Sequence, residues 1–282
     1  MMVDSNSVEF DHCRDLAITP GGVFEFTSRF LQADELEPLL ALYALRQAVS
    51  SIPYASTDDP VKWTKLKWWG EELMAPPDAV SRHPVLRALW QSGARTRLGD
   101  TLLLRLVGDA LSEIDAAPAG NESDLFERQA ALGATDILLE LALEDAEVAT
   151  QSLDFLGAAT GLFNLISRFP ANFISEANRL PLSLLAKHNI SAEQLHQKSH
   201  SDELAQITQQ LAELALDWYA KGFSGLETNL SAPGFKHLQL RWAMEQRRLG
   251  VIRRDTHGFL EAGKNFGPAD AWFAWRFLRR LG

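Results

Sequence analysis

Apolar residues along the chain recur every three or four positions, and this helical spacing is the feature that most restricts the fold. It is clear in four stretches, at residues 36–44, 102–114, 134–141 and 204–218. Wound at 3.6 residues per turn, each stretch presents one apolar face. The apolar–polar alternation that predicts strands persists almost nowhere between turn residues. The sequence therefore predicts an all-α protein.

Polar residues mark where several of these helices are expected to begin. Asn121 or Ser123 can cap the helix that follows, and Ser191 and Gln194 have the spacing of a capping box. The run Thr57-Asp58-Asp59-Pro60 is expected to form a turn and a helix cap rather than a metal site. Because the segments between helices are short, we expect residues 1–282 to form a single domain.

Composition argues against several functional classes. The chain has 282 residues, and no run of 18 uncharged apolar residues that would predict a transmembrane helix. Its first residues have neither the basic start nor the apolar stretch of a signal peptide. The single cysteine, Cys13, fits a reducing compartment. A net charge of −10 argues against nucleic-acid binding. We expect a cytoplasmic protein.

Positive charge is concentrated in a basic C-terminal segment, residues 230–282. This segment holds ten Lys and Arg against four Asp and Glu, and includes the pairs Arg247-Arg248 and Arg253-Arg254 followed by Arg276, Arg279 and Arg280. Two interpretations are open. The charges pair with acids elsewhere on the chain, or they make a weak, salt-sensitive contact with the inner face of an anionic membrane.

Signals for other chemistries are weak. His196 and His200 share one helix face, but a zinc site needs three or four ligands. Glu71 and Glu72 are expected to face solvent. The sequence contains no nucleophile elbow, phosphate loop or dinucleotide fingerprint. These patterns alone assign no activity.

Three segments, taken together, resemble the squalene and phytoene synthase family. The first consists of residues 12–16, 30–31 and 39–46. The second is residues 65–73, with the run Trp68-Trp69-Gly70, followed by residues 83–85. The third is residues 157–168, followed by residues 180–181 and 187–191. The resemblance implies an isoprenoid-synthase-like helical bundle around a central cavity. In active members that cavity holds two prenyl diphosphates, which are coupled head to head. Mg²⁺ bridges the diphosphates to two aspartate-rich motifs.

The positions of those acids hold other residues in this chain. Ser50, Ser51 and Tyr54 stand in place of the first motif, and Arg168 and Asn172 in place of the second. Hydroxyl groups do not supply the charge that Mg²⁺ takes from carboxylates. An arginine repels a metal ion, although it can bind a phosphate bidentately. The comparison with the family therefore implies no catalytic residue, no metal and no cofactor.

The resemblance also implies which side chains border the cavity. The two motif helices carry few charges on the faces expected to line it, and such a space suits a lipid tail. The candidate residues are Tyr43, Gln47, Ser50, Ser51 and Tyr54 on the first helix, and Gly161, Asn164, Leu165 and Arg168 on the second.

Within the family, the chain is most similar to the branch of respiratory complex I assembly factors and their bacterial relatives. That branch shares residues corresponding to Pro170, Leu180-Pro181 and His188. The resemblance implies a non-catalytic protein that binds a partner protein or an apolar, lipid-like ligand, in respiratory complex assembly. The alternative is a head-to-head prenyl transferase with a degenerate diphosphate site, in which Arg168 replaces metal. Only that alternative leaves a role for Mg²⁺.

Overall fold

Every regular element of the described residues is a helix, which confirms the all-α prediction. The computed structural model describes residues 5–55, 57–76, 81–144, 150–170, 179–191, 194, 201–226, 236–263 and 266–281. Contacts group the chain into two compact units, and the residues of α7 (Glu122–Leu143) are divided between them. Unit 1 comprises residues 1–116, 135–147 and 233–238, and unit 2 comprises residues 117–134, 148–232 and 239–282. That the whole chain forms a single domain stays a prediction.

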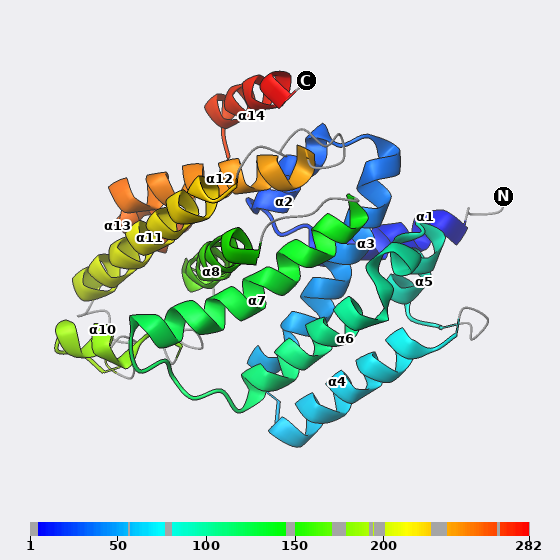
Figure 1. Cartoon of the computed structure of the whole chain (residues 1–282), viewed down its shortest axis with the longest axis horizontal. Helices are drawn as coiled ribbons and strands as arrows, with labels where there is room; N and C mark the ends of the chain where they lie inside the picture. Colours follow the sequence, from blue (N-terminus) through cyan, green and yellow to red (C-terminus); the bar gives the residue numbers. More distant parts are fainter. Residues whose placement is uncertain are drawn as a thin grey trace. The chain divides into compact units, whose positions relative to one another are not determined.

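Unit 1 is built on the central helix α3. The unit contains the C-terminal part of α7 together with α1 (Ser5–Ala17), α2 (Val23–Thr27), α3 (Ala33–Ser50), α4 (Asp59–Met74), α5 (Pro84–Gln91), α6 (Ala94–Ile114) and the 3₁₀ turns η1 (Ser28–Phe30) and η2 (Ile52–Tyr54). Helices α1, α5 and α6 each contact α3, and α4 packs along α6 (Figure 1). Gly99 interrupts α6 with a φ of +67°, a left-handed conformation that glycine adopts at little cost.

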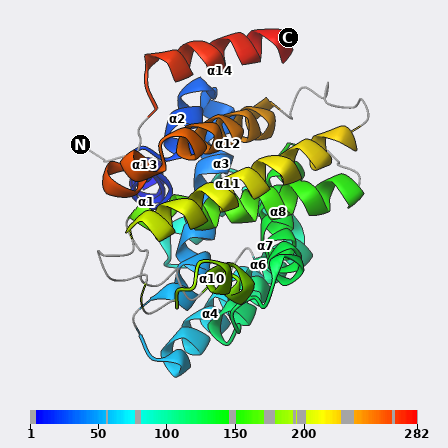
Figure 2. The same ribbon diagram turned by 90° about the vertical axis from the view of Figure 1, so that its left-hand side faces the viewer.

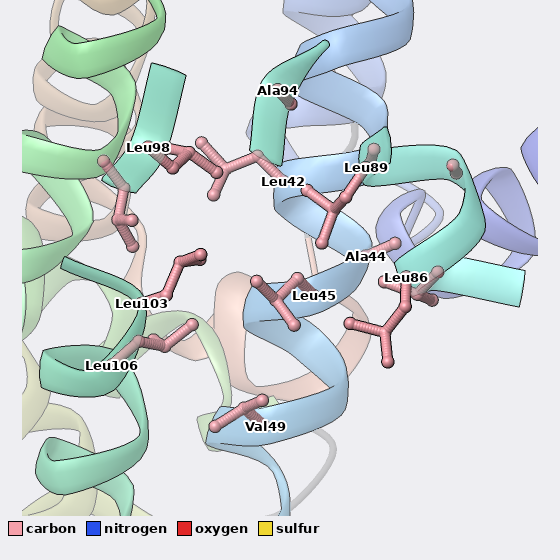
Figure 3. Close-up of a cluster of buried hydrophobic side chains, with 14 of the residues drawn as sticks. Leu42, Ala44, Leu45, Val49, Leu86, Leu89, Ala94, Leu98, Leu103 and Leu106 are labelled. Atoms are coloured by element: carbon pink, nitrogen blue, oxygen red, sulfur yellow. The ribbon is translucent and has the colours of Figure 1, made fainter. Parts of the chain in front are cut away.

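Leucines from α3, α5 and α6 make the apolar core of unit 1. Figure 3 shows Leu42 and Leu45 of α3 between Leu89 of α5 on one side and Leu103 of α6 on the other. All four side chains are buried. Burying a leucine contributes roughly 1.5–3 kcal/mol, so this layer fixes α3 firmly between its neighbours.

Unit 2 is organised around the pair α8 and α11, which lie along each other (Figure 2). The unit contains the N-terminal part of α7 with α8 (Thr150–Ser167), α10 (Leu182–Lys187), α11 (Ser201–Ser224), most of α12 (Lys236–Arg254), α13 (Thr256–Ala262) and α14 (Pro268–Leu281). Aromatic rings add to this packing: Phe126 of α7 meets Phe155 of α8 and Trp218 of α11 edge-on. None of the helices searched among the described residues is long and apolar enough to cross a bilayer.

Helices α7 and α8 approach each other closely in unit 2 because glycines lie where they meet. A Cβ built on Gly133 would lie 1.9 Å from the carbonyl oxygen of Gly157. One built on Gly157 would lie 2.8 Å from the carbonyl oxygen of Ala130. Both obstacles are backbone atoms, which cannot move aside without separating the helices.

The helices and two of the caps expected from the sequence are confirmed. The four periodic stretches fall within α3, α6, α7 and α11. The Oδ1 of Asn121 accepts the backbone N–H groups of Ser123 and Asp124 at 2.8 and 3.1 Å. The backbone N–H of Ser191 donates to Gln194 Oε1 at 2.8 Å, and that of Gln194 donates to Ser191 Oγ at 3.2 Å.

The turn expected at residues 57–60 is also where a helix begins, although its side chains act differently from the prediction. α4 starts at Asp59, and the side chain of Asp58 makes no capping hydrogen bond. Asp59 instead pairs with Lys62 at 2.9 Å, one turn along the helix. The expected pair His196 and His200 lies outside the described residues.

Replacing Gly133 by alanine is expected to destabilise the protein strongly. The added methyl group collides with the backbone of α8, and overpacking of this kind costs about 1–3 kcal/mol or more. Gly250→Ala is the matched control, because a Cβ there meets nothing within 4 Å and alanine favours a helix interior by roughly 0.5–1 kcal/mol. Equilibrium unfolding in urea measures both changes. Equal stability of the two variants would contradict the close approach of α7 and α8.

Candidate functional site

A buried glutamate, Glu140, is the centre of the most extensive polar cluster described in unit 1. It lies on α7, and its side chain has no exposed surface. Its Oε1 accepts the hydroxyl of Tyr43 at 2.7 Å and the guanidinium of Arg46 at 3.0 Å. Arg46 also pairs with Asp136, one turn before Glu140 on the same helix. The polar face of α3 is thus connected to acids of α7.

His237 approaches the other oxygen of the same carboxylate. Its Nδ1 lies 3.3 Å from Glu140 Oε2, and its Nε2 lies 3.0 Å from Thr27 Oγ1. An ionised Glu140 places a proton on Nδ1, and in the neutral ring Nε2 then accepts from the threonine hydroxyl. Phe24 stacks on the ring of Tyr43 at 3.7 Å and meets His237 edge-on. The polar groups are therefore held by packed aromatic rings.

The contribution of this cluster to the stability of unit 1 follows from its burial. Taking an isolated carboxylate out of water costs several kcal/mol, and the cost is offset only when donors surround it. Hydrogen bonds to charged groups contribute about 1.5–3 kcal/mol each. Tyr43 and Arg46 supply two such bonds, and Arg46 stacks over the Tyr43 ring at 4.7 Å. The cluster therefore fixes the side chains of α3 that precede the first motif position.

A second group of acids lies where α6 faces α7. Asp109 accepts the hydroxyl of Thr135 at 2.5 Å. Burial raises the pKa of Asp109; the neighbouring charges of Asp136 and Glu113 act in the same direction, while the Thr135 hydrogen bond and Arg105 oppose them. The carboxylates of Asp109, Glu113 and Asp136 therefore lie close enough in unit 1 to affect one another.

The first-motif positions lie at and just after the end of α3, and each carries a hydroxyl group. Ser50 and Ser51 are exposed. Tyr54 lies in η2 and donates its hydroxyl to Glu113 Oε2 at 2.7 Å. A phenol engaged with a carboxylate is a poor ligand for Mg²⁺, and two serine hydroxyls bring no negative charge. These residues do not fit the metal that the fold family implies.

Among the other candidates on α3, Tyr43 and Gln47 differ in environment. Tyr43 points to Glu140, whereas Gln47 is exposed. The candidates on the second helix belong to unit 2. Gly161 packs against Gln129, where a Cβ would lie 2.6 Å from the carbonyl oxygen, and Leu165 is fully buried. Asn164 and Arg168 are half-buried in and just after α8.

The candidates on α3 and those on α8 fall in different units, so a shared ligand space stays a prediction. The expected second-motif position Asn172 lies outside the described residues.

One combination of side chains has the spacing of metal ligands. Glu140, Glu144 and His237 each place one ligand atom within 4.8 Å of the others. Carboxylates and imidazole suit several divalent transition metals. However, Nδ1 of His237 is in hydrogen-bond contact with Glu140, and the cation of Arg46 lies beside the same carboxylate. Ion pairing within the protein accounts for the arrangement.

Unit 2 has its own buried tyrosine–glutamate pair. Tyr219 of α11 donates to Glu245 of α12 and lies 3.2 Å from the hydroxyl of Thr160 on α8. Arg241 approaches the other oxygen of Glu245 at 3.5 Å. Burial raises the pKa of Tyr219 well above its usual value, and the charge of Glu245 raises it further. The phenol is therefore a hydrogen-bond donor at any physiological pH.

The surface of unit 2 also has an open groove of about 760 Å³ between the start of α7, α10 and α11. Its walls carry Lys187 and the acids Glu122, Glu213 and Asp217 beside leucines. None of the ligand-cavity candidates predicted from the sequence lines it, although Pro181 of the Leu180-Pro181 pair does. Its mixed charges distinguish it from the apolar space expected for a lipid tail.

Comparison with known proteins identifies the family to which the chain belongs. The family model for squalene/phytoene synthase matches residues 23–265, most of the chain. The chain belongs to the squalene/phytoene synthase family. No curated protein matches this family member in sequence.

Two solved structures show the same fold. One is a dehydrosqualene synthase in complex with ligand, with a TM-score of 0.72, 16% identity, and coverage of 98% of this chain and 96% of the other. The second is the squalene synthase HpnC from Alicyclobacillus acidocaldarius, with a TM-score of 0.64, 17% identity, and coverage of 89% and 95%. At these identities the likeness establishes the all-α isoprenoid-synthase fold of this family member.

The partners of Tyr43 and Tyr54 were not predicted from the sequence. Glu140 and Asp136 stand four residues apart within an apolar helix, and Glu144 continues the series by one turn. Acids at i, i+4 and i+8 beside an apolar stripe are a recognisable signal for a buried ionic cluster. Glu113, at the end of another such stripe, carries the same signal.

Replacing Tyr54 by phenylalanine is expected to lower the free energy of unfolding by about 1.5–3 kcal/mol, because Glu113 loses a hydrogen bond to its charge. Ser50→Ala is the control: the residue is exposed, and its change is expected to stay within about 0.5 kcal/mol. Urea unfolding of both variants measures the difference. If Tyr54→Phe is as stable as the control, the Tyr54–Glu113 hydrogen bond does not contribute to the free energy of unfolding.

Proposed function

We propose that this family member is non-catalytic and binds an apolar, lipid-like ligand or a partner protein. The observation that carries the proposal is the state of the first-motif positions. Ser50 and Ser51 are exposed hydroxyls, and the Tyr54 hydroxyl is engaged with Glu113. Removing metal from such a site forfeits several kcal/mol of charge stabilisation in the transition state. The fold is then a scaffold for binding.

The process in which the protein acts is part of the proposal. The residues Pro170, Leu180-Pro181 and His188 resemble those of respiratory complex I assembly factors. In the structure, the His188 ring lies 3.2 Å from Gln210 Nε2, which fits a structural role for this histidine. We infer a cytoplasmic protein that acts in respiratory complex assembly, at the inner face of a membrane.

An alternative function is prenyl transfer. The solved relatives named above are synthases, and Arg168 follows α8 at the second-motif position. Its guanidinium has the geometry to bind a phosphate bidentately. In this alternative the arginine holds a prenyl diphosphate in place of metal.

Pyrophosphate release separates the two functions. We expect purified protein to release none from farnesyl or geranylgeranyl diphosphate, with or without Mg²⁺, because the first-motif acids are absent. An active dehydrosqualene synthase, assayed in parallel, controls for the substrate and the detection. Measurable turnover would establish the prenyl transferase. If turnover is present, Arg168→Ala should abolish it, because in that alternative the arginine holds the diphosphate.

Ligand binding has a separate readout. Organic extraction of the purified protein, followed by mass spectrometry, is expected to yield a prenyl or acyl chain. An unrelated protein purified in the same way from the same host serves as the control for adventitious lipid. Extracts of equal composition would leave a partner protein as the ligand of this family member.

A further inference from the structure

Helix α14 is attached to unit 2 by one of its faces. Asp270, at its start, pairs with Arg247 of α12, whose guanidinium also stacks over the Phe273 ring at 5.0 Å. Ala274 is buried, and Phe273 stacks with Phe277 one turn further on at 6.2 Å. These residues recur at helical spacing, so they form a single inner face.

The opposite face of α14 presents large aromatic side chains to solvent. Trp272 is 59% exposed and Trp275 is 46% exposed. Arg276 and Arg279 lie on the same face and are exposed as well. The guanidinium of Arg276 stacks over Trp272 at 4.5 Å, and that of Arg279 stacks over Trp275 at 4.1 Å. Grouped exposed aromatic residues mark an interaction surface.

The charge on this face is of one sign. Asp270 is the only acid in α14, and it points to Arg247 on the inner side. The outer face therefore combines indole rings with guanidinium groups, and Arg280 adds to their charge at the exposed end of the helix. Such a surface complements a partner that is both apolar and anionic.

A bilayer with anionic lipids has this combination at a single depth. Tryptophan is enriched at the membrane–water interface, where its ring contacts acyl chains and its N–H contacts polar groups. Arginine beside it reaches lipid phosphates, with which guanidinium forms bidentate hydrogen bonds. Protein interfaces are also enriched in Trp and Arg, so these residue types alone do not identify the partner. The uniform positive charge of this face beside its indole rings is typical of helices that lie on anionic lipid, and we therefore favour a membrane over an acidic protein.

We propose that α14 is a membrane-docking helix, which lies flat on an anionic bilayer with Trp272 and Trp275 inserted among the headgroups. Arg276, Arg279 and Arg280 bind lipid phosphates. The proposal does not depend on whether the protein is catalytic. It resembles the general mode of interfacial helices, in which aromatic insertion and electrostatic attraction act together.

The structure also shows which arginines of the basic C-terminal segment are engaged within the protein and which are exposed. Arg247 pairs with Asp270, and Arg248 stacks over Phe266 at 4.7 Å. Burial lowers the pKa of Arg248, which agrees with its position inside the unit. These two arginines are engaged within unit 2. Arg253 and Arg254 are exposed in the last turn of α12.

Co-sedimentation of the full chain with vesicles tests the proposal. Phosphatidylcholine vesicles with about one third phosphatidylserine are compared with pure phosphatidylcholine vesicles, at low and at high salt. We expect binding to the anionic vesicles alone, weakened by salt because the attraction of exposed charges is screened. Each arginine near the surface is worth on the order of five-fold in binding.

Three double variants identify the surface. Trp272→Ala/Trp275→Ala keeps the charge and is expected to weaken binding at least about ten-fold. Arg276→Glu/Arg279→Glu is expected to abolish it. Arg253→Glu/Arg254→Glu makes the same change in charge on α12 and is expected to lower binding by less than about five-fold. Circular dichroism checks that each variant is folded.

Any one of three outcomes would overturn the proposal. Wild-type protein that stays in the supernatant at low salt has no membrane-docking helix. Binding that is unchanged in Trp272→Ala/Trp275→Ala assigns the contact to general positive charge rather than to α14. So does binding that Arg253→Glu/Arg254→Glu weakens as much as Arg276→Glu/Arg279→Glu.

Discussion

The buried carboxylate of Glu140 is the constraint on which unit 1 depends. Three segments far apart in the sequence meet there: α3 through Tyr43 and Arg46, α7 through Glu140 itself, and the start of α12 through His237. An unpaired carboxylate at this depth would be prohibitively costly, so each donor must be in place when the unit folds. The leucine layer of α3, α5 and α6 supplies most of the burial, and the ionic cluster fixes the register of α3 against α7.

This constraint bears on how the family scaffold is used in this chain. α3 is the helix whose end carries the first-motif positions, and its inward polar residues are bonded to the protein's own acids. Tyr54, just beyond its end, repeats the arrangement with Glu113. We infer that polar groups of the motif region serve the stability of the unit, which is consistent with the proposed non-catalytic function. Membrane docking by α14 involves a different surface, and its test is independent of the proposed non-catalytic function.

Helix positions were the part of the structure that local sequence could predict. Apolar spacing identified α3, α6, α7 and α11, and cap chemistry identified the bonds of Asn121 and of Ser191 with Gln194, because each depends on residues within one or two turns. The partner of Tyr43 is 97 residues away along the chain, and no local pattern names it. The close approach at Gly133 and the inward role of Arg247 were likewise out of reach. Only packing reveals which side chain meets a glycine, or which arginine of a basic segment is engaged.

If Glu140 constrains unit 1 in this way, its carboxylate and the Arg46 guanidinium are energetically coupled. A double-mutant cycle in urea unfolding, with Arg46→Met, Glu140→Gln and the double variant, measures that coupling directly. Each single variant is expected to lose about 3 kcal/mol, since Arg46→Met removes the guanidinium beside the buried Glu140 carboxylate, and Glu140→Gln removes one of the acids with which Arg46 pairs. The double variant should lose less than the sum, with a coupling free energy on the order of 2 kcal/mol. Strictly additive losses would contradict the claim.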